Sequence, residues 1–146
     1  LSEMIDESIE NAQHMYSSHR IIKQKAIPEV TMYGDMLRLE QAMINLLSNA
    51  MKYSPGAQAI HVNAVILSNE VRIEIIDQGL GISKKNQLKI FDRFFRAEEL
   101  SPVISGLGMG LYITNEIVKQ HQGHMSVKSE LGKGSTFCIT LPLGRD

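Results

Sequence analysis

The chain has 146 residues with 43% hydrophobic content, which suffices for one globular domain with a single core. Its formal net charge is -1 with no block of Lys and Arg, so a nucleic-acid partner is not indicated. No run approaches the roughly 20 apolar residues of a membrane helix. The single cysteine, Cys138, cannot form a disulfide within the chain, and its apolar surroundings predict a core residue in a reducing compartment.

The first segment has helical periodicity. Its apolar residues recur at intervals of four, four, three and four, which predicts an amphipathic helix from Leu1 to about Ser17. Because the chain begins inside this helix and without a methionine, we expect a piece of a longer protein. Two extended segments should follow, "RIIKQKAI" and "EVTMY", separated by Pro28 and closed by Gly34.

The middle of the chain predicts a helix and a hairpin. The helix should follow Asp35, which can cap its N-terminus, and end at the "SPG" that begins at Ser54. The alternating segments "AIHVNAVIL" and "EVRIEIID" predict a β-hairpin around Ser68 and Asn69. A short helix is expected in "NQLKIFDRFF", and a loop in "RAEELSPVISGLGMG". The expected core positions of the long helix are Leu39, Met43, Leu46, Leu47 and Ala50.

The last part of the chain should contain a helix from Leu111 to about Gln120 and a second hairpin. That hairpin is formed by "HMSVKS" and "STFCITLP", around Gly132 and Gly134. Helices that alternate with antiparallel hairpins favour an α+β, two-layer α/β sandwich with a mixed, mostly antiparallel sheet covered on one face by helices. We expect residues 1–146 to form a single domain.

The helix after Asp35 carries polar residues opposite its apolar face. Asn45, Asn49 and Lys52 share one side of it, and Asn is an indifferent helix former, so the pair at i and i+4 needs a reason. One reason is a solvated surface. The other is a magnesium-bound polyphosphate, because amide oxygens suit Mg²⁺ and a lysine attracts phosphate.

Asp77 ends its strand on the same face as the strand's Val and Ile residues. A carboxylate on the core side is costly without a partner, although an ordinary strand-end Asp remains an alternative. Gly79 and Gly81, in D-x-G-x-G, leave room for a ligand to approach the backbone. An ionised Asp accepts a hydrogen bond from the exocyclic amine of adenine but meets an acceptor in guanine, so Asp77 is a candidate base selector.

The turn "GLGMGL", from Gly106 to Leu111, leads directly into a predicted helix. Its alternate glycines permit unusual backbone angles, and amides at a helix start bind phosphate, although a flexible loop explains the pattern as well. The turn is neither G-x-G-x-x-G nor a Walker A loop. The usual dinucleotide and P-loop folds are therefore excluded.

Five motifs in order resemble those of the catalytic, ATP-binding domain of sensor histidine kinases, which belongs to the Bergerat-fold ATPases. They follow a "GD..RL.Q" pattern that begins at Gly34, and the resemblance spans nearly the whole chain. It implies the Bergerat ATP-binding fold. The motifs are "NLLSNAMKYS" for the N box, "DQGLGI" for the first glycine box, "IFDRFFR" for the F box, "GLGMGL" for the second glycine box and "GKGSTFCITLP" for the terminal glycine box.

The resemblance assigns the magnesium and phosphate contacts residue by residue. Asn49 is the implied Mg²⁺ ligand, Asn45 supports the triphosphate and Lys52 reaches phosphate. Arg93 and Arg96 are candidates for contact with the γ-phosphate, with a solvated charge as the alternative for each. Asn45, Lys52, Arg93 and Arg96 are thus the implied catalytic residues.

At the adenine end, the resemblance implies that Asp77 reads the amine, aided by water near Gly81 and Thr136, while Tyr53 packs on adenine or ribose. A lid over residues 96–105 would be anchored by two phenylalanines of the F box. The implied nucleotide-binding residues are Asn45, Asn49, Lys52, Tyr53, Asp77, Gly79, Gly81, Ile82, Phe91, Gly106, Leu107, Gly108, Met109, Gly110, Leu111, Ser135 and Thr136, and the lid anchors are Phe91 and Phe94.

The family's full enzyme transfers the γ-phosphoryl of ATP to a histidine that is followed by an acidic, an apolar and a basic residue. None of the chain's 5 histidines has that context. The acceptor is therefore expected on a separate dimerisation domain of a homodimeric parent, which in turn serves a response-regulator receiver domain. We expect this chain to be a monomeric, cytoplasmic domain without membrane contact, in a parent that can itself be membrane-anchored.

Three alternatives share the fold. A gyrase-type or mismatch-repair hydrolase has a glutamate general base where Asn45 stands, and an amide cannot take that role. An anti-sigma-type serine kinase usually lacks the F box. A non-catalytic ATP-binding or partner-docking module remains open, because the chain contains no acceptor.

Overall fold

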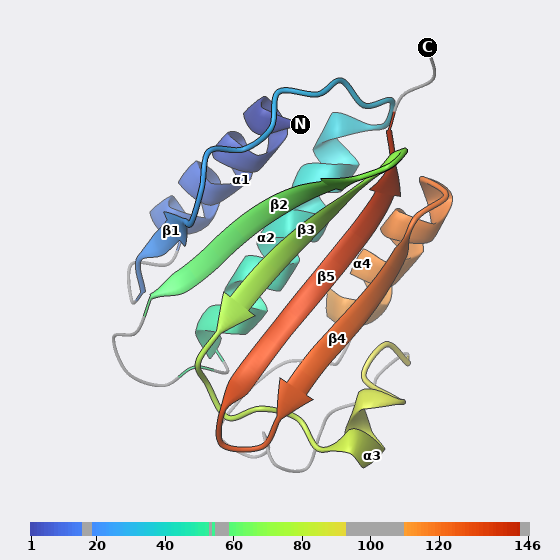
Figure 1. Ribbon diagram of the computed structural model, residues 1–146. Helices are drawn as coiled ribbons and strands as arrows, with labels where there is room; N and C mark the ends of the chain where they lie inside the picture. The colour runs from blue at the N-terminus through green and yellow to red at the C-terminus, as the bar shows by residue number, and fades with distance from the viewer. Residues whose placement is uncertain (16–18, 53, 55–58, 93–109, 144–146) are drawn as a thin grey trace.

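A five-stranded sheet with helices on one face forms the architecture (Figure 1). The computed structural model describes residues 1–15, 19–52, 54, 59–92 and 110–143. Helices α1, α2 and α4 lie on the same side of the sheet, so the expected α+β sandwich is confirmed. The elements are α1 (Ser2–Met15), β1 (Ile21–Lys23), α2 (Met36–Lys52), β2 (Ile60–Leu67), β3 (Glu70–Asp77), α3 (Lys84–Gln87), α4 (Gly110–Gln120), β4 (His124–Glu130) and β5 (Gly134–Pro142).

The sheet has the strand order β1-β2-β3-β5-β4. Only β1 and β2 pair in parallel among these neighbours, and the other pairs are antiparallel, so the sheet is mixed and mostly antiparallel as expected. Ser68 has a positive φ of 53° in the turn between β2 and β3, where Leu67 pairs with Glu70. Both predicted hairpins are therefore present.

The hydrophobic core lies between the helices and the inner face of the sheet. Leu47 of α2 and Val62 of β2 are fully buried, and burial of such side chains contributes about 1.5–3 kcal/mol each. None of the described helices is long and apolar enough to cross a membrane. All the core positions expected on α2 are buried, namely Leu39, Met43, Leu46, Leu47 and Ala50.

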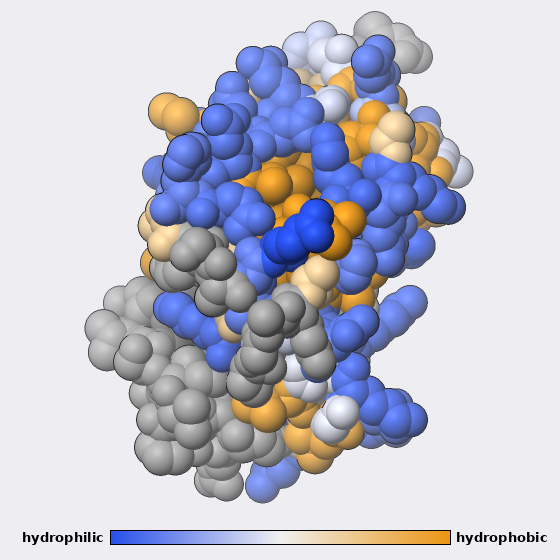
Figure 2. All heavy atoms as spheres, turned by 90° about the vertical axis from the view of Figure 1, so that its left-hand side faces the viewer, coloured by the Kyte–Doolittle hydropathy of each residue, from blue (hydrophilic) through white to orange (hydrophobic). Residues whose placement is uncertain are grey.

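The outer side of α1 remains polar. Figure 2 views the molecule from the side of α1 and β1 and shows a largely hydrophilic surface around smaller hydrophobic patches. Ile5 and Ala12 face the core with no exposed surface, whereas Asp6 and Glu10 are exposed. The predicted amphipathic helix is therefore confirmed, within the bounds Ser2–Met15.

Two sequence predictions about local structure were wrong. Residues 29–33 form no strand, because Pro28 has no amide hydrogen and its carbonyl accepts from the Val30 amide at 3.2 Å, which bends the chain locally. The short helix expected within residues 86–95 begins earlier, as α3. Ser83 caps α3, its hydroxyl accepting from the Asn86 amide at 3.3 Å, and residues 93–95 lie outside the described chain.

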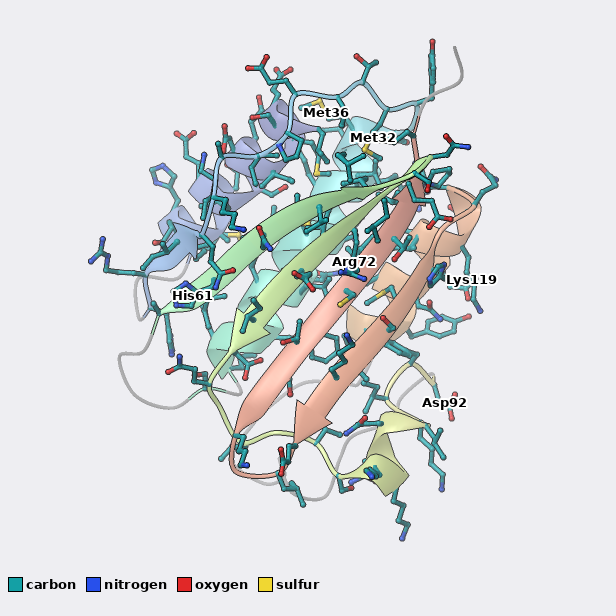
Figure 3. All side chains as sticks on the ribbon, viewed as in Figure 1. Met32, Met36, His61, Arg72, Asp92 and Lys119 are labelled. Carbon is teal, nitrogen blue, oxygen red and sulfur yellow. The ribbon has the colours of Figure 1, made fainter. Side chains whose placement is uncertain are left out.

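The face of the sheet away from the helices is open and polar, and Figure 3 shows Arg72 over it. The Asn63 amide donates to the Glu74 carboxylate at 3.2 Å, and Arg72 Nε lies 3.6 Å from Glu74 Oε2. Cys138 pairs with Glu74 on this face and is 2% exposed. Its burial is as predicted, but it lies on the polar side of the sheet. Burial and the Glu74 charge raise the pKa of the thiol.

Two glycines allow the loop after β3 to contact the β4–β5 hairpin. Gly81 has a φ of 74°, and a Cβ there would lie 2.1 Å from the Glu130 carbonyl oxygen. Gly134 has a φ of 103°, and a Cβ there would lie 2.2 Å from the Asp77 carbonyl oxygen. Side chains at either position would push the backbones apart.

We expect Gly134→Ala to lower the free energy of unfolding by about 3 kcal/mol or more, because a positive-φ strain adds to a backbone clash. Gly132→Ala is the matched control, since its φ of 82° is also positive but a Cβ there would meet no atom within 4 Å. That control should cost only about 1 kcal/mol. Urea unfolding measures both. Equal losses would contradict the close packing at Gly134.

Candidate functional site

The polar face of α2 packs against the beginning of α4. Asn45 Nδ2 donates to the Thr114 hydroxyl at 3.3 Å, and that hydroxyl donates to the Gly110 carbonyl at 2.8 Å. A Cβ added at Gly110 would lie 3.8 Å from Asn49 Nδ2. Asn45 and Asn49 are half-buried, whereas Lys52 is exposed at the end of α2. These asparagines therefore belong to an interface between two helices.

The first turn of α4 adds anion-binding groups to this interface. Amides in the first turn of a helix have no partner within the helix and carry the positive end of its dipole. Gly110 and Leu111 supply the beginning of α4, and both are half-buried. This region thus combines helix amides with the carboxamides of Asn45 and Asn49, and Lys52 follows Asn49 in the last turn of α2. That combination suits a phosphate group with its counter-cation.

A buried carboxylate stands at the end of β3. Asp77 is 5% exposed, and its Oδ1 accepts from the Gly79 amide at 2.9 Å and the Ser135 amide at 3.3 Å. Burial raises the pKa of Asp77 to about 6, and the two amide hydrogen bonds offset that rise only in part. Neither bond uses Oδ2, which leaves that oxygen for a ligand donor.

The beginning of β5, in the terminal glycine box, lies beside this carboxylate. Antiparallel pairing sets Asp77 opposite Ser135, which is 6% exposed on the same face of the sheet. Thr136 is half-buried, pairs with Ile76 and by alternation falls on the open face. A pocket of about 410 Å³ at this end of the sheet is lined by Asp77 and Ser135 and also by Ile76, Lys128 and Thr136, which alternate onto the open face, so it extends to the face away from the helices. The assistance expected from Thr136 stays a prediction, and the register favours Ser135.

The remaining described residues of the predicted site support the loop after Asp77. Ile82 is 4% exposed, and its amide donates to the Ser129 hydroxyl at 2.7 Å. Gly81 is buried against the β4–β5 turn, and Phe91 packs half-buried against the core. The predicted site residues outside the described chain are Tyr53, Arg93, Arg96, Gly106, Leu107, Gly108 and Met109, together with Phe94 and the rest of the expected lid.

The described residues of the site gather at one end of the molecule. In Figure 1, the end of α2, the beginning of α4, the end of β3 and the beginning of β5 all lie toward the bottom. Sequence reasoning missed Thr114, Ser129 and Gln87, which hold these pieces in place. A signal existed for Ser129, because it shares a strand face with Met125 and Val127 and is the one polar residue of that series.

We expect Asp77→Asn to stabilise the folded state above pH 6. The pKa of this carboxyl is about 6 in the folded state, against 3.8 for the unfolded chain. Folding therefore favours the protonated carboxyl. Its contribution to the free energy of unfolding is fully present below pH 3.8 and is lost as the pH rises through 6. The full shift corresponds to about 3 kcal/mol. Asn keeps an oxygen for both amides, so the variant should lack this loss of stability.

Urea unfolding at pH 5 and pH 8 measures the effect, and the exposed Asp92→Asn is the control for removal of a charge. The wild type should lose stability between these pH values relative to Asp77→Asn. Parallel pH profiles for the two proteins would show that Asp77 is not the titrating group.

Comparison with known proteins places these features in a family. Residues 34–145 match the family described as histidine kinase-, DNA gyrase B-, and HSP90-like ATPase. The chain is 39% identical over 112 residues to the adaptive-response sensory kinase SasA of Thermosynechococcus vestitus, covering 76% of this chain and 29% of that protein. It is 38% identical to the sensor protein kinase WalK of Staphylococcus epidermidis, covering 81% of this chain and 20% of that protein.

A solved structure agrees with the sequence comparison. The mycobacterial sensor histidine kinase MprB superposes with a TM-score of 0.84 at 29% identity, covering 99% of this chain and 96% of that one. The chain thus spans less than a third of the two curated relatives named above and nearly all of this solved domain. The resemblance inferred from the motifs is confirmed, and the chain belongs to the histidine kinase-, DNA gyrase B-, and HSP90-like ATPase family.

Proposed function

We propose that this chain is the catalytic, ATP-binding domain of a longer sensor histidine kinase and donates the γ-phosphoryl of Mg-ATP to a histidine on a separate domain. The observation that carries the proposal is the placement of the buried Asp77 and the Asn45–Asn49 face of α2 at the same end of the molecule. One group suits a purine amine and the other suits a metal-bound phosphate chain. A single nucleotide satisfies both.

The adenine would bind at Asp77, with its exocyclic amine donating to the carboxylate. The triphosphate would extend toward the beginning of α4, where helix amides and Lys52 attract phosphate. Membership of this ATPase family supports ATP as the bound nucleotide. Tyr53, Arg93, Arg96 and the residues 106–109 remain proposed contacts.

The magnesium site is a proposal based on donor chemistry. Asn49 lies beside the beginning of α4, and a carboxamide oxygen suits a hard cation that keeps water and phosphate oxygens as its other ligands. The bond between Asn45 Nδ2 and Thr114 leaves Asn45 Oδ1 free of that contact, so Asn45 can support the same region. Bound Mg²⁺ supplies neutralisation of phosphate charge.

The environments of the described histidines support a phosphoryl acceptor outside this chain. His121 uses both ring nitrogens, with Nδ1 2.8 Å from the Ile117 carbonyl and Nε2 accepting from the Asp35 amide at 2.9 Å. His19 is 7% exposed. The sequence context of the others also differs from an acceptor motif. Water is a poor alternative acceptor, because the Asn45 amide is no general base.

The proposal extends to the parent protein. Its dimerisation domain would carry the acceptor histidine in a homodimer, and a response-regulator receiver domain would take the phosphoryl group next. We expect this domain to lie in the cytoplasm, where ATP is available, whether or not the parent is membrane-anchored. We treat residues 1–146 as one catalytic domain of that parent.

We expect the chain to bind ATP more tightly than GTP in the presence of Mg²⁺. Asp77→Asn should weaken ATP binding by about tenfold or more, because its amide group offers a donor where the carboxylate offers only acceptors. Titration calorimetry measures both nucleotides, with Asp6→Asn, an exposed carboxylate on α1, as the control. Equal affinities for ATP and GTP, or full ATP affinity in Asp77→Asn, would exclude base reading by Asp77. Asn49→Ala should separately reduce the gain in affinity that Mg²⁺ provides.

We expect labelled ATP to mark an added acceptor domain and not this chain. Asn49→Ala and Lys52→Ala should each slow this transfer by about tenfold or more, because they remove metal and phosphate contacts. Arg38→Ala, an exposed cation near the other end of α2, is the control and should transfer normally. Acid-labile, base-stable label on the isolated chain would show an acceptor within it. Rapid phosphate release without an acceptor would favour a hydrolase.

A further inference from the structure

The Ser129 hydroxyl connects three segments around the Asp77 corner. It accepts from the Ile82 amide at 2.7 Å, lies 3.0 Å from the Gly134 carbonyl oxygen and lies 2.7 Å from the Ser135 hydroxyl. These contacts join the loop after β3 to β4 and β5. Ser129 is half-buried, and Ser135 is 6% exposed.

The three contacts admit one arrangement of hydrogen atoms. A serine hydroxyl has one proton to donate and two lone pairs that accept. The Gly134 carbonyl can only accept, so it takes the Ser129 proton. The Ile82 amide can only donate, so it uses one Ser129 lone pair. The last lone pair then accepts the proton of Ser135, whose oxygen keeps only acceptor capacity.

We propose that Ser129 fixes the Ser135 hydroxyl as a hydrogen-bond acceptor beside the Asp77 carboxylate, which makes this corner selective for a ligand with an exocyclic amine. The inference rests on the proposed function, since it concerns the base of the nucleotide that Asp77 binds. Ser129 is a positioning residue here, because it acts through Ser135 and touches no ligand itself.

Two acceptors on paired residues of neighbouring strands match the chemistry of an adenine amine. The amine has two hydrogens, so it can donate to Asp77 and, directly or through one water, to Ser135. A keto oxygen at the same place would face two acceptors. Neither the keto oxygen nor the Asp77 and Ser135 oxygens would then gain a hydrogen bond from the contact. The Ser135 amide already donates to Asp77 Oδ1 at 3.3 Å, which keeps the two residues in one corner.

Gln87 holds Ser129 in the position that this arrangement needs. Its Nε2 donates to the Ser129 carbonyl at 3.0 Å and to the Ile82 carbonyl at 2.7 Å. The side chain therefore bridges the same two segments that the Ser129 hydroxyl joins. Rotation of Ser129 away from Ser135 would have to break contacts that this bridge stabilises.

The test compares the affinity for ATP with that for inosine triphosphate, in which a keto group replaces the amine. Ser129→Ala should reduce the preference for ATP by about tenfold, mainly through tighter binding of inosine triphosphate, because Ser135 regains a proton to donate. Ser129→Thr restores a hydroxyl and should keep the wild-type ratio. Ser126→Ala, an exposed serine on the same strand, is the control for strand substitution.

An unchanged ratio in folded Ser129→Ala, with Asp77→Asn still losing ATP affinity, would overturn this inference and leave the proposed function standing. Full ATP affinity in Asp77→Asn would overturn the proposed function as well. Ser135→Ala provides a second test that does not depend on the folding of Ser129→Ala. It should weaken ATP and strengthen inosine triphosphate, and equal weakening of both would contradict an acceptor at Ser135.

Discussion

Burial of the Asp77 carboxylate at the end of a hydrophobic strand is the constraint on which the neighbouring structure depends. An ionised group there needs donors, and the available ones are backbone amides from its own loop and from β5. The β5 amide can reach Asp77 only because Gly134 has no side chain against the Asp77 carbonyl. Gly81 has the equivalent role against Glu130. The first and the terminal glycine boxes, distant in sequence, are thus needed by the same buried charge.

The two amides do not fully compensate the burial. The pKa of Asp77 remains raised to about 6, so the ionised form is destabilised in the absence of a ligand at neutral pH. A ligand amine that donates to the carboxylate would supply the missing stabilisation. The buried Asp77 carboxylate therefore lowers folding stability at neutral pH, and binding of the proposed amine would recover that stability. A substitution such as Asp77→Asn, which removes the buried charge, would also remove the hydrogen bond to the amine.

The helices and hairpins that the sequence predicted correctly are those in which the spacing of apolar residues along the chain decides which side chains are buried. Leu47 and its companions on α2 are buried as expected, and both hairpins have the expected turns. The strand predicted for residues 29–33 is absent, because an alternating segment becomes a strand only where a neighbouring strand and free backbone amides can pair with it. The sequence analysis assigned the water-mediated contact to Thr136, whereas the pairing register sets Ser135 opposite Asp77. Ser129 was missed because its hydroxyl joins its own strand to two other segments, the loop after β3 and the beginning of β5.

The proposed phosphate end depends on a different constraint, the spacing between α2 and α4. At one end of this helix pair, Asn45 bonds to Thr114 beside Gly110. At the other end, His121 accepts from the Asp35 amide through Nε2, and its Nδ1 must carry the proton because its partner is the Ile117 carbonyl. The neutral ring thus ties the beginning of α2 to the end of α4. Because both ends are tied, the helix pair would set the width of the proposed phosphate region, while the sheet would set the proposed base corner. A nucleotide that contacts both layers must match their separation, so affinity for the whole molecule reports on the packing between helices and sheet as well as on the contacts at either end.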